Sequence, residues 1–308
     1  MTTKAIAPKS GNHIRQSLSG KIFNVFNYLF IVFFCFTIFF PIWDLIVISF
    51  SRPQDISVLR TNMWPTVWIT DAYKYCFQDP LLGRAFINSI ARTILGSLYH
   101  LTVCCLAAFT LTRKEMPFIK FFTIIFLVTM YFSGGMIPTY LNIRSLGLLD
   151  TFWVYILPSG FSMYNTIVIR NYFNSIDKAM EESATIDGCS MIQFMYKILL
   201  PLSKPVLATV GLWQIVAHWN SWFDNMIYAK PESLITLQYL LRRMSDSAQA
   251  LQDQAAMMSI TDQMATGLPT PQTIIAATTV IIMVPVVIVY PFLQRYFVQG
   301  IMVGAVKG

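Results

Sequence analysis

Residues 181–205 read EESATIDGCSMIQFMYKILLPLSKP and form the longest polar-leaning interruption in the second half of a very apolar chain. Apolar segments long enough to cross a bilayer flank it, at about 151–168 and 206–228. The segment has helix signals on both sides of Gly188, and a proline-bounded apolar run follows. We therefore expect a helix–glycine–helix unit held between two membrane spans.

The composition predicts a polytopic membrane protein. Of the 308 residues, 55% are hydrophobic and only 12% are charged, whereas soluble domains carry about 25% charged residues. The net charge of +7 is better explained by loop lysines and arginines facing an anionic leaflet. No basic run interleaves with aromatic residues, so we expect no nucleic-acid partner.

The apolar runs predict an all-α membrane protein with six transmembrane helices. The first is too long for a signal peptide and lacks a cleavage site, so we expect an uncleaved span, with Pro41 as a candidate kink. The expected spans lie at about 22–50, 86–111, 117–132, 151–168, 206–228 and 272–292. We expect Gly134, Gly135 and Pro138 to break the helix after the third span, and Pro158 and Gly160 to interrupt the fourth. The residues between 229 and 271 form a long outer segment rich in Ser, Asp, Gln and Met.

The distribution of basic residues predicts that both termini lie in the cytoplasm. With that orientation, thirteen lysines and arginines fall in inner segments and eight in outer segments, and the inner segments are the shorter ones. Residues 181–205 then lie in the cytoplasm. Of the five cysteines only Cys76 would face outside, so we expect no extracellular disulfide within the chain.

The cytoplasmic stretch predicts two short helices. Ser175 is a candidate N-cap, Asp177 suits the first turn, and Gly188 supplies a left-handed residue after Asp187. The first helix would have about 12 residues and a length of roughly 18 Å. The second would end before Pro201.

The first of these helices has the features of a docking element. Glu181, Glu182 and Asp187 would leave acidic groups exposed, and Ala184 and Gly188 would leave a shallow strip that a partner can approach closely. An amphipathic connector lying on the membrane is the alternative, although anionic lipid would disfavour the three acidic residues there.

The same stretch resembles the EAA loop of the permease subunits of bacterial ABC importers. The sugar-permease form of that loop reads E-A-A-x-x-D-G-A…F…I-x-L-P-x-x-x-P. The matching residues are Glu182, Ala184, Asp187, Gly188, Phe194, Ile198, Leu200, Pro201 and Pro205, with Ser183 and Cys189 replacing alanines. Both replacements are small, so close approach to a partner stays possible.

The resemblance extends over about 23–308. The segments around 137–151 and 219–224 (Trp-Asn-Ser-Trp-Phe-Asp) and the ending at 300–308 are similar to those of maltose-permease-like proteins. The branch that transports complex oligosaccharides is the most similar group.

This resemblance implies a type I importer permease with a cytoplasmic tail at 1–20 and a transmembrane domain at 21–308. The core of that domain would lie at about 82–294 and the coupling loop at 175–205. The implied partners are a second permease, two ATP-binding subunits, an extracellular sugar-binding lipoprotein, an oligosaccharide and membrane lipid in the bacterial cytoplasmic membrane. The implied ATPase-coupling residues are Glu182, Ser183, Ala184, Asp187, Gly188, Ile198 and Pro201.

ATP and Mg²⁺ would bind to the partner subunits, and this chain would hold no cofactor, metal or catalytic site. The sequence contains no G-x-x-x-x-G-K-[ST] phosphate loop. The glycines near the C-terminus do not form one, because Lys307 is not followed by Ser or Thr.

The fifth span carries residues suited to a sugar path, since aromatic faces stack on sugar rings and amides or carboxylates bind hydroxyl groups. The candidates are Trp213, Gln214, His218, Trp219, Asn220, Trp222 and Asp224. They do not share one helical face, so only a subset can line the path. The alternative is that they pack between helices or form an interfacial tryptophan belt.

Other segments and other protein classes leave further alternatives. We expect the outer segment 229–271 to contact the binding protein, unless it only covers the partner permease. Arg92 either lines a water-filled path or pairs within the helix bundle.

An ion- or proton-coupled secondary transporter would need buried carboxylates, but Asp44 and Asp224 lie near the ends of their spans. A membrane-embedded enzyme is disfavoured because the three histidines are scattered and no HExxH occurs.

Overall fold

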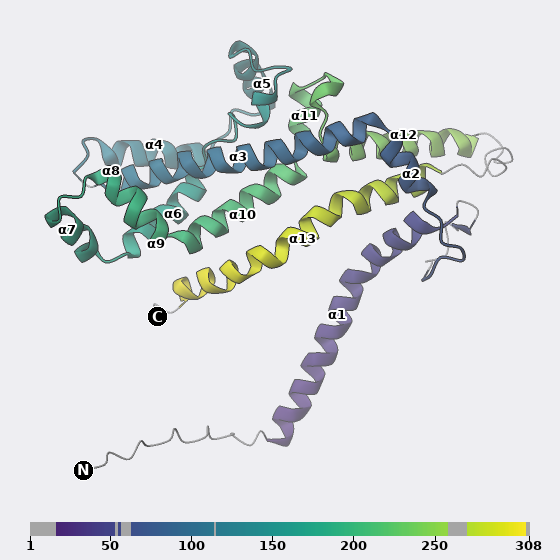
Figure 1. Ribbon diagram of the computed structural model, residues 1–308, viewed down its shortest axis with the longest axis horizontal. Coiled ribbons are helices and arrows are strands. Elements are labelled where there is room, and N and C mark those ends of the chain that lie inside the picture. Colours follow the sequence, from purple (N-terminus) through teal and green to yellow (C-terminus); the bar gives the residue numbers. More distant parts are fainter. Residues whose placement is uncertain (1–16, 53–54, 57–62, 114, 258–269, 306–308) are drawn as a thin grey trace.

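The computed structural model describes residues 17–52, 55–56, 63–113, 115–257 and 270–305. These residues form helices and connecting turns, with no β-strand among them. Figure 1 shows α3 (Pro80–Thr112) running along most of the molecule, with α6 (Met163–Ser175) and α10 (Lys204–Asn220) packed beside it. Most of the expected tail 1–20, part of the outer segment and the last three residues lie outside the described ranges.

Helix α3 is the central element because one of its faces is made of small and polar residues that other helices can approach. Asp79 caps its N-terminus by accepting a hydrogen bond from the backbone N–H of Leu81 at 2.8 Å, and Pro80 occupies the first helical turn. The buried residues of this face include Ala85, Ser89, Gly96, Cys104 and Ala108. They let α6 and α10 pack closely along its length.

Three described helices are long and apolar enough to cross a membrane: α1 (Leu18–Phe50), α3 and the Pro271–Ile288 part of α13 (Pro271–Ala305). The number becomes five if each of two bent helix pairs is taken as one span. The predicted multi-pass helical fold agrees with this arrangement, while the number six stays a prediction.

The predicted interruption of the fourth span at Pro158 and Gly160 is confirmed, but the helix starts later than the predicted bounds 151–168. The first part of that stretch is a short 3-10 helix, η2 (Phe152–Tyr155), followed by turns through Pro158 and Gly160. Helix α6 begins only at Met163, where the Ser162 side chain accepts a hydrogen bond from the N–H of Asn165 at 3.5 Å. The apolar run therefore folds as a bent entry and a helix displaced towards the C-terminus.

The third predicted span at 117–132 is a helix of 13 residues, α4 (Ile119–Tyr131), which is bent by 119° relative to α5 (Met136–Ser145). Gly135 lies in the turn between them with φ of +83°, a value that glycine adopts at little cost. The break expected from the neighbouring glycines is thus confirmed.

The segment at 229–271 contains a long helix. Helix α12 (Leu237–Met257) occupies about half of that segment, for which no helix was predicted. Leu237 and Leu240 are buried in one cluster with Ala72 and Cys76 of α2 (Asp71–Gln78). The many polar residues of α12 hid the apolar side by which it packs.

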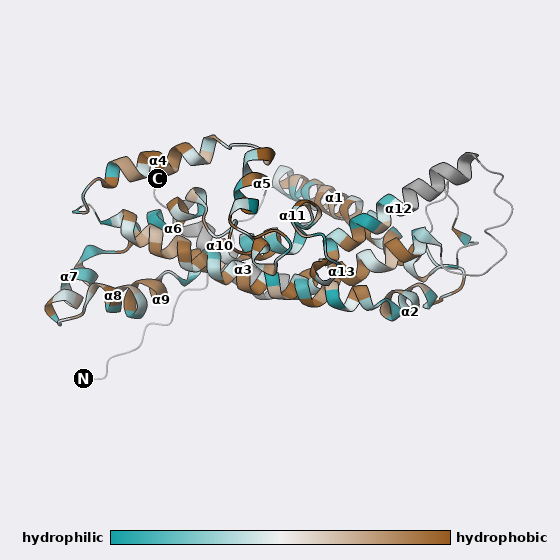
Figure 2. Ribbon diagram, turned by 90° about the horizontal axis from the view of Figure 1, so that it is seen from above, coloured by the Kyte–Doolittle hydropathy of each residue, from teal (hydrophilic) through white to brown (hydrophobic). Residues whose placement is uncertain are grey.

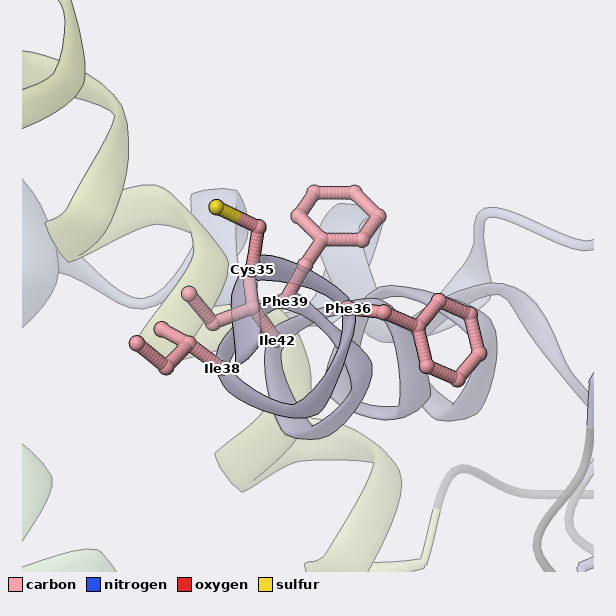
Figure 3. Close-up of a pocket in the computed structure, with 5 residues that line it drawn as sticks. All are labelled: Cys35, Phe36, Ile38, Phe39 and Ile42. Carbon is pink, nitrogen blue, oxygen red and sulfur yellow. The ribbon is translucent and has the colours of Figure 1, made fainter. Parts of the chain in front are cut away.

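Helix α1 exposes apolar side chains around its whole circumference. Every side chain from Val25 to Phe39 is exposed, and Figure 3 shows an open patch on this helix lined by Cys35, Phe36, Ile38, Phe39 and Ile42. Figure 2 likewise shows α4 mostly in apolar colours, whereas α7 carries polar ones. Apolar surfaces such as those of α1 and α4 are stable against lipid chains rather than water.

All five cysteines are free thiols. Cys76, the one expected outside, is buried against Thr278 with its sulfur 3.4 Å from the Thr278 hydroxyl oxygen. Burial raises the pKa of the Cys76 thiol, so it stays protonated and packs as part of the core.

Candidate functional site

The polar stretch 175–205 folds as a compact tip at one end of α3 (Figure 1). Its first helix, α7 (Lys178–Ile186), has nine residues and is capped by Asp177, whose side chain accepts a hydrogen bond from the N–H of Ala179 at 3.0 Å. The predicted Ser175 cap is wrong, because Ser175 is the last residue of α6. Ile176 and Asp177 adopt extended backbone angles, and that bend shortens the helix.

Gly188 ends α7 in the left-handed conformation, with φ of +77°, as predicted. The N–H groups of Gly188 and Cys189 donate to the carbonyls of Thr185 and Ala184 at 3.0 and 2.9 Å, which closes a Schellman turn. Ser190 and Gln193 then form a reciprocal capping box that starts α8 (Met191–Phe194). The joint between the two helices is thus fixed by local hydrogen bonds.

The second helix does not end before Pro201, in contrast to the prediction. A π-helical turn, η3 (Met195–Leu199), follows α8 and leads into α9 (Leu200–Leu202), which contains Pro201. In a regular α-helix the proline ring would meet the carbonyl of Lys197, four residues earlier. The wider π turn, closed by a bond from the Leu200 N–H to the Met195 carbonyl, accommodates the proline.

Five of the seven predicted coupling residues lie on the exposed surface of the tip, and two do not. The exposed ones are Glu182, Ser183, Asp187, Gly188 and Pro201. Ile198 is half-buried, and Ala184 is buried with 7% exposure in a cluster that includes Cys105, Ala108 and Phe109 of α3. The methyl group of Ala184 therefore packs into the chain's own core and does not lie on an exposed strip.

Ile186 is an exposed apolar residue of α7 that is not among the predicted coupling residues. Ile186 is 86% exposed beside Asp187, and Met191 and Ile192 at the start of α8 are exposed as well. Isolated exposed apolar residues are common, but these three lie on one small tip with Glu182. The tip thus combines acidic and apolar groups.

An ion pair between a buried arginine and a partly exposed aspartate links α3 to the break that follows α10. Arg92, with 1% exposure, forms a two-pronged ion pair with Asp224 in α11 (Phe223–Tyr228), and its Nη1 lies 3.1 Å from a carboxylate oxygen. Its guanidinium carbon is 4.5 Å from the centre of the Tyr155 ring. The alternative that Arg92 pairs within the bundle is therefore confirmed.

Two histidines lie between the helices near this pair. His218 is buried against Gly96, so closely that a β-carbon on Gly96 would fall 2.5 Å from the imidazole Nε2. His100 Nδ1 lies 2.7 Å from the carbonyl oxygen of Ser159, and its Nε2 lies 2.9 Å from the amide nitrogen of Asn165. Both rings fill contacts between helices, which is a packing role.

The seven predicted path residues do not come together as one surface. Trp219 is buried, with its indole N–H donating to the carbonyl of Ile282 at 3.3 Å, and Asp224 is held by Arg92. Asn220 is exposed and accepts a hydrogen bond from Gln238 at 3.4 Å. The members that keep some exposed surface besides Asn220 are Trp213, Gln214, Trp222 and, in part, Asp224.

Two positioning features were missed because they join residues far apart in the sequence. Arg113 at the end of α3 forms an ion pair with Glu181 in α7. Asn225 accepts hydrogen bonds from the N–H and hydroxyl of Thr236 at 2.8 and 3.1 Å and donates to the carbonyl of Ala229 at 2.8 Å. No local pattern distinguishes these residues from other polar ones.

The chain is similar to known transport proteins over nearly its whole length, although no family model matches it. It is 33% identical over 292 residues to the polygalacturonan/rhamnogalacturonan transport system permease protein YtcP of Bacillus subtilis, covering 94% of this chain and 100% of that protein.

Solved structures show the same fold. A bacterial ABC transporter involved in the import of the acidic polysaccharide alginate has a chain with a TM-score of 0.80 and 31% identity, covering 92% of this chain and 99% of that one. A bacterial alginate ABC transporter in complex with alginate pentasaccharide-bound periplasmic protein has a chain with a TM-score of 0.54 and 17% identity, covering 89% and 94%. The chain therefore belongs to the family of permease subunits of carbohydrate ABC importers.

Proposed function

We propose that this subunit forms half of the path through which an ATP-driven importer moves an oligosaccharide across the bacterial cytoplasmic membrane. A periplasmic or lipid-anchored binding protein delivers the sugar from outside. The similarity to permeases of carbohydrate transport systems over the whole chain supports this role. The alginate importer in complex with its loaded periplasmic protein supports a binding-protein partner.

The observation that carries the coupling role is the shape of the tip at 175–205. Helix α7, Gly188 and α8 form a locally locked corner at the end of α3 remote from α2 and α12 (Figure 1). Glu182 and Ile186 project from this corner without being covered by the rest of the described chain. In this proposal, the corner sits in a groove of a cytoplasmic ATPase subunit that binds ATP and Mg²⁺.

Both termini and the corner lie on the cytoplasmic side in this proposal, and α2, α11 and α12 lie outside. The path between the two permeases is lined in part by Trp213, Gln214, Asn220 and Trp222, which keep exposed surface. A cation-coupled mechanism is less well supported, because Arg92 neutralises Asp224.

Replacing Gly188 by valine is expected to uncouple ATP hydrolysis from sugar delivery. A β-branched residue is strained at φ of +77°, so the corner between α7 and α8 must rearrange. In the complete importer reconstituted in proteoliposomes, we expect stimulation of the ATPase by loaded binding protein to fall about fivefold or more. The binding protein is loaded with oligosaccharides from digested polygalacturonan or alginate, whichever it retains.

Gly147 provides a matched control for this substitution. It also has a positive φ, +68°, and open space around its α-carbon, but it lies between α5 and η2, away from the corner. Gly147→Val introduces similar backbone strain and should leave the stimulated ATPase rate unchanged. Equal stimulation in Gly188→Val and the parent importer would contradict the coupling role.

A further inference from the structure

An ion pair between Arg113 and Glu181 joins the end of α3 to the first turns of α7. Arg113 is the C-cap residue of α3, and its guanidinium carbon lies 4.3 Å from the centre of the Phe109 ring, one turn earlier. The guanidinium group is therefore held on one side by an aromatic face and on the other by a carboxylate. This restricts the position of Glu181 relative to α3.

The side of α7 that carries Glu181 is distinct from its exposed side. Ala184, three residues after Glu181, lies on the same helical face and is buried against the core around Ala108 and Phe109. Glu182 and Ile186 are exposed. Helix α7 thus has an inner face, with Glu181 and Ala184, and an outer face available to a partner.

Few polar contacts hold α7 to the rest of the protein. Within the described part of the chain, the Arg113–Glu181 pair is the one side-chain hydrogen bond or ion pair that connects α7 to another helix. Extended residues at Ile176 and Asp177 precede α7, and the left-handed Gly188 follows it. Without the pair, α7 keeps apolar contact with α3 through Ala184, and the two joints allow it to tilt while α3 stays in place.

The other half of α3 is bonded to the segment on the opposite side of the molecule. Asn88 donates to the carbonyls of Ser233 and Ile235, both at 2.9 Å, and the N–H of Leu237 donates to the Ser89 hydroxyl at 2.9 Å. Arg92 holds Asp224 in the same region. With 33 residues, α3 is about 50 Å long and has no proline beyond its first turn.

We propose that the Arg113–Glu181 pair makes α3 follow α7, so that a displacement of α7 reaches residues 221–237. Glu181 and Arg113 are positioning residues in this scheme, and they act separately from Glu182, which faces outwards. The inference rests on the proposed docking of α7 to an ATPase subunit. It adds the route by which that docking is transmitted through this chain.

Hydrogen–deuterium exchange on the complete importer, with its ATPase subunits, tests this route without a sugar ligand. The complex is measured with and without Mg²⁺ and a non-hydrolysable ATP analogue. In the parent complex we expect the analogue to change the exchange rates of amides in both 178–186 and 221–237. In Glu181→Gln the response at 178–186 should remain, and the response at 221–237 should fall about fivefold or more.

Exchanging the two charges distinguishes transmission from a merely structural role. Arg113→Glu combined with Glu181→Arg restores the attraction and should restore the response at 221–237, which neither single change retains. If Glu181→Gln does not assemble, Arg113→Gln breaks the same pair with α7 unaltered. A parent-like response at 221–237 in the assembled single variants would overturn the inference, and so would a double variant that assembles without recovering it.

The neighbouring Glu182→Gln separates this inference from the docking proposal. It alters an exposed carboxylate by the same isosteric change, and docking through the outer face predicts that both segments lose their response. If the parent complex shows no response at 178–186, the docking proposal fails. If Glu182→Gln has its expected effect and Glu181→Gln has none, only the transmission route fails.

Discussion

Replacing Asp224 by alanine is expected to destabilise the folded permease by about 3–5 kcal/mol, because the change leaves a buried guanidinium group without its counter-charge. Arg92 is 1% exposed, and its other contacts are the Ser221 carbonyl oxygen at 3.3 Å and the face of Tyr155. Neither supplies a negative charge. The measurement is the thermal unfolding temperature of the purified importer in lipid nanodiscs, together with the yield of assembled protein.

Asp246 is the matched control for this change. It forms an exposed ion pair with Arg242 four residues away on α12, so Asp246→Ala should cost less than about 1 kcal/mol. Converting both Arg92 and Asp224 to leucine should be less harmful than Asp224→Ala, since no unpaired charge remains. Equal unfolding temperatures for Asp224→Ala and Asp246→Ala would contradict the dependence of the buried Arg92 on its counter-charge.

Two alanine substitutions in α3 are expected to change stability in opposite directions. At Gly96 the added methyl group would lie 2.5 Å from two atoms of the buried His218 ring, so α10 must shift or the ring must move, at a cost of about 1–3 kcal/mol. At Gly83 nothing lies within 4 Å of the added methyl group. Alanine there should stabilise the helix by roughly 0.5–1 kcal/mol.

The same unfolding assay measures both alanine variants. Adding His218→Ala to Gly96→Ala removes the ring that the methyl group meets, so the double variant should be less destabilised than the sum of the two single changes. Strict additivity of the two effects would show that the Gly96 methyl group is accommodated without contact with His218.

The corner at Gly188 could be predicted from the sequence because its determinants are local. A glycine after a polar helix and a Ser-x-x-Gln capping box specify the turn and the start of the next helix within a few residues. The cap of α7 was assigned two residues too early, since Ser175 and Asp177 are both good capping residues. Local preferences alone do not choose between them.

The elements that were mispredicted depend on what they pack against. The run at 151–168 is apolar enough for a span, yet η2 buries Val154 and Tyr155 against Ala229, a contact between residues far apart in sequence. Helix α12 is rich in polar residues because only one side of it packs, mainly on α13 and α3. The partners of Arg92 and Arg113 lie 132 and 68 residues away, which no spacing rule reveals.

The π turn at Met195–Leu199 also limits how the chain can change in length. A π turn contains one more residue than the α turn that would replace it. Deleting one residue there would turn it into a regular α turn, in which the ring of Pro201 meets a carbonyl four residues earlier. Insertions and deletions between Gly188 and Pro201 are therefore restricted even where individual side chains are exposed and replaceable.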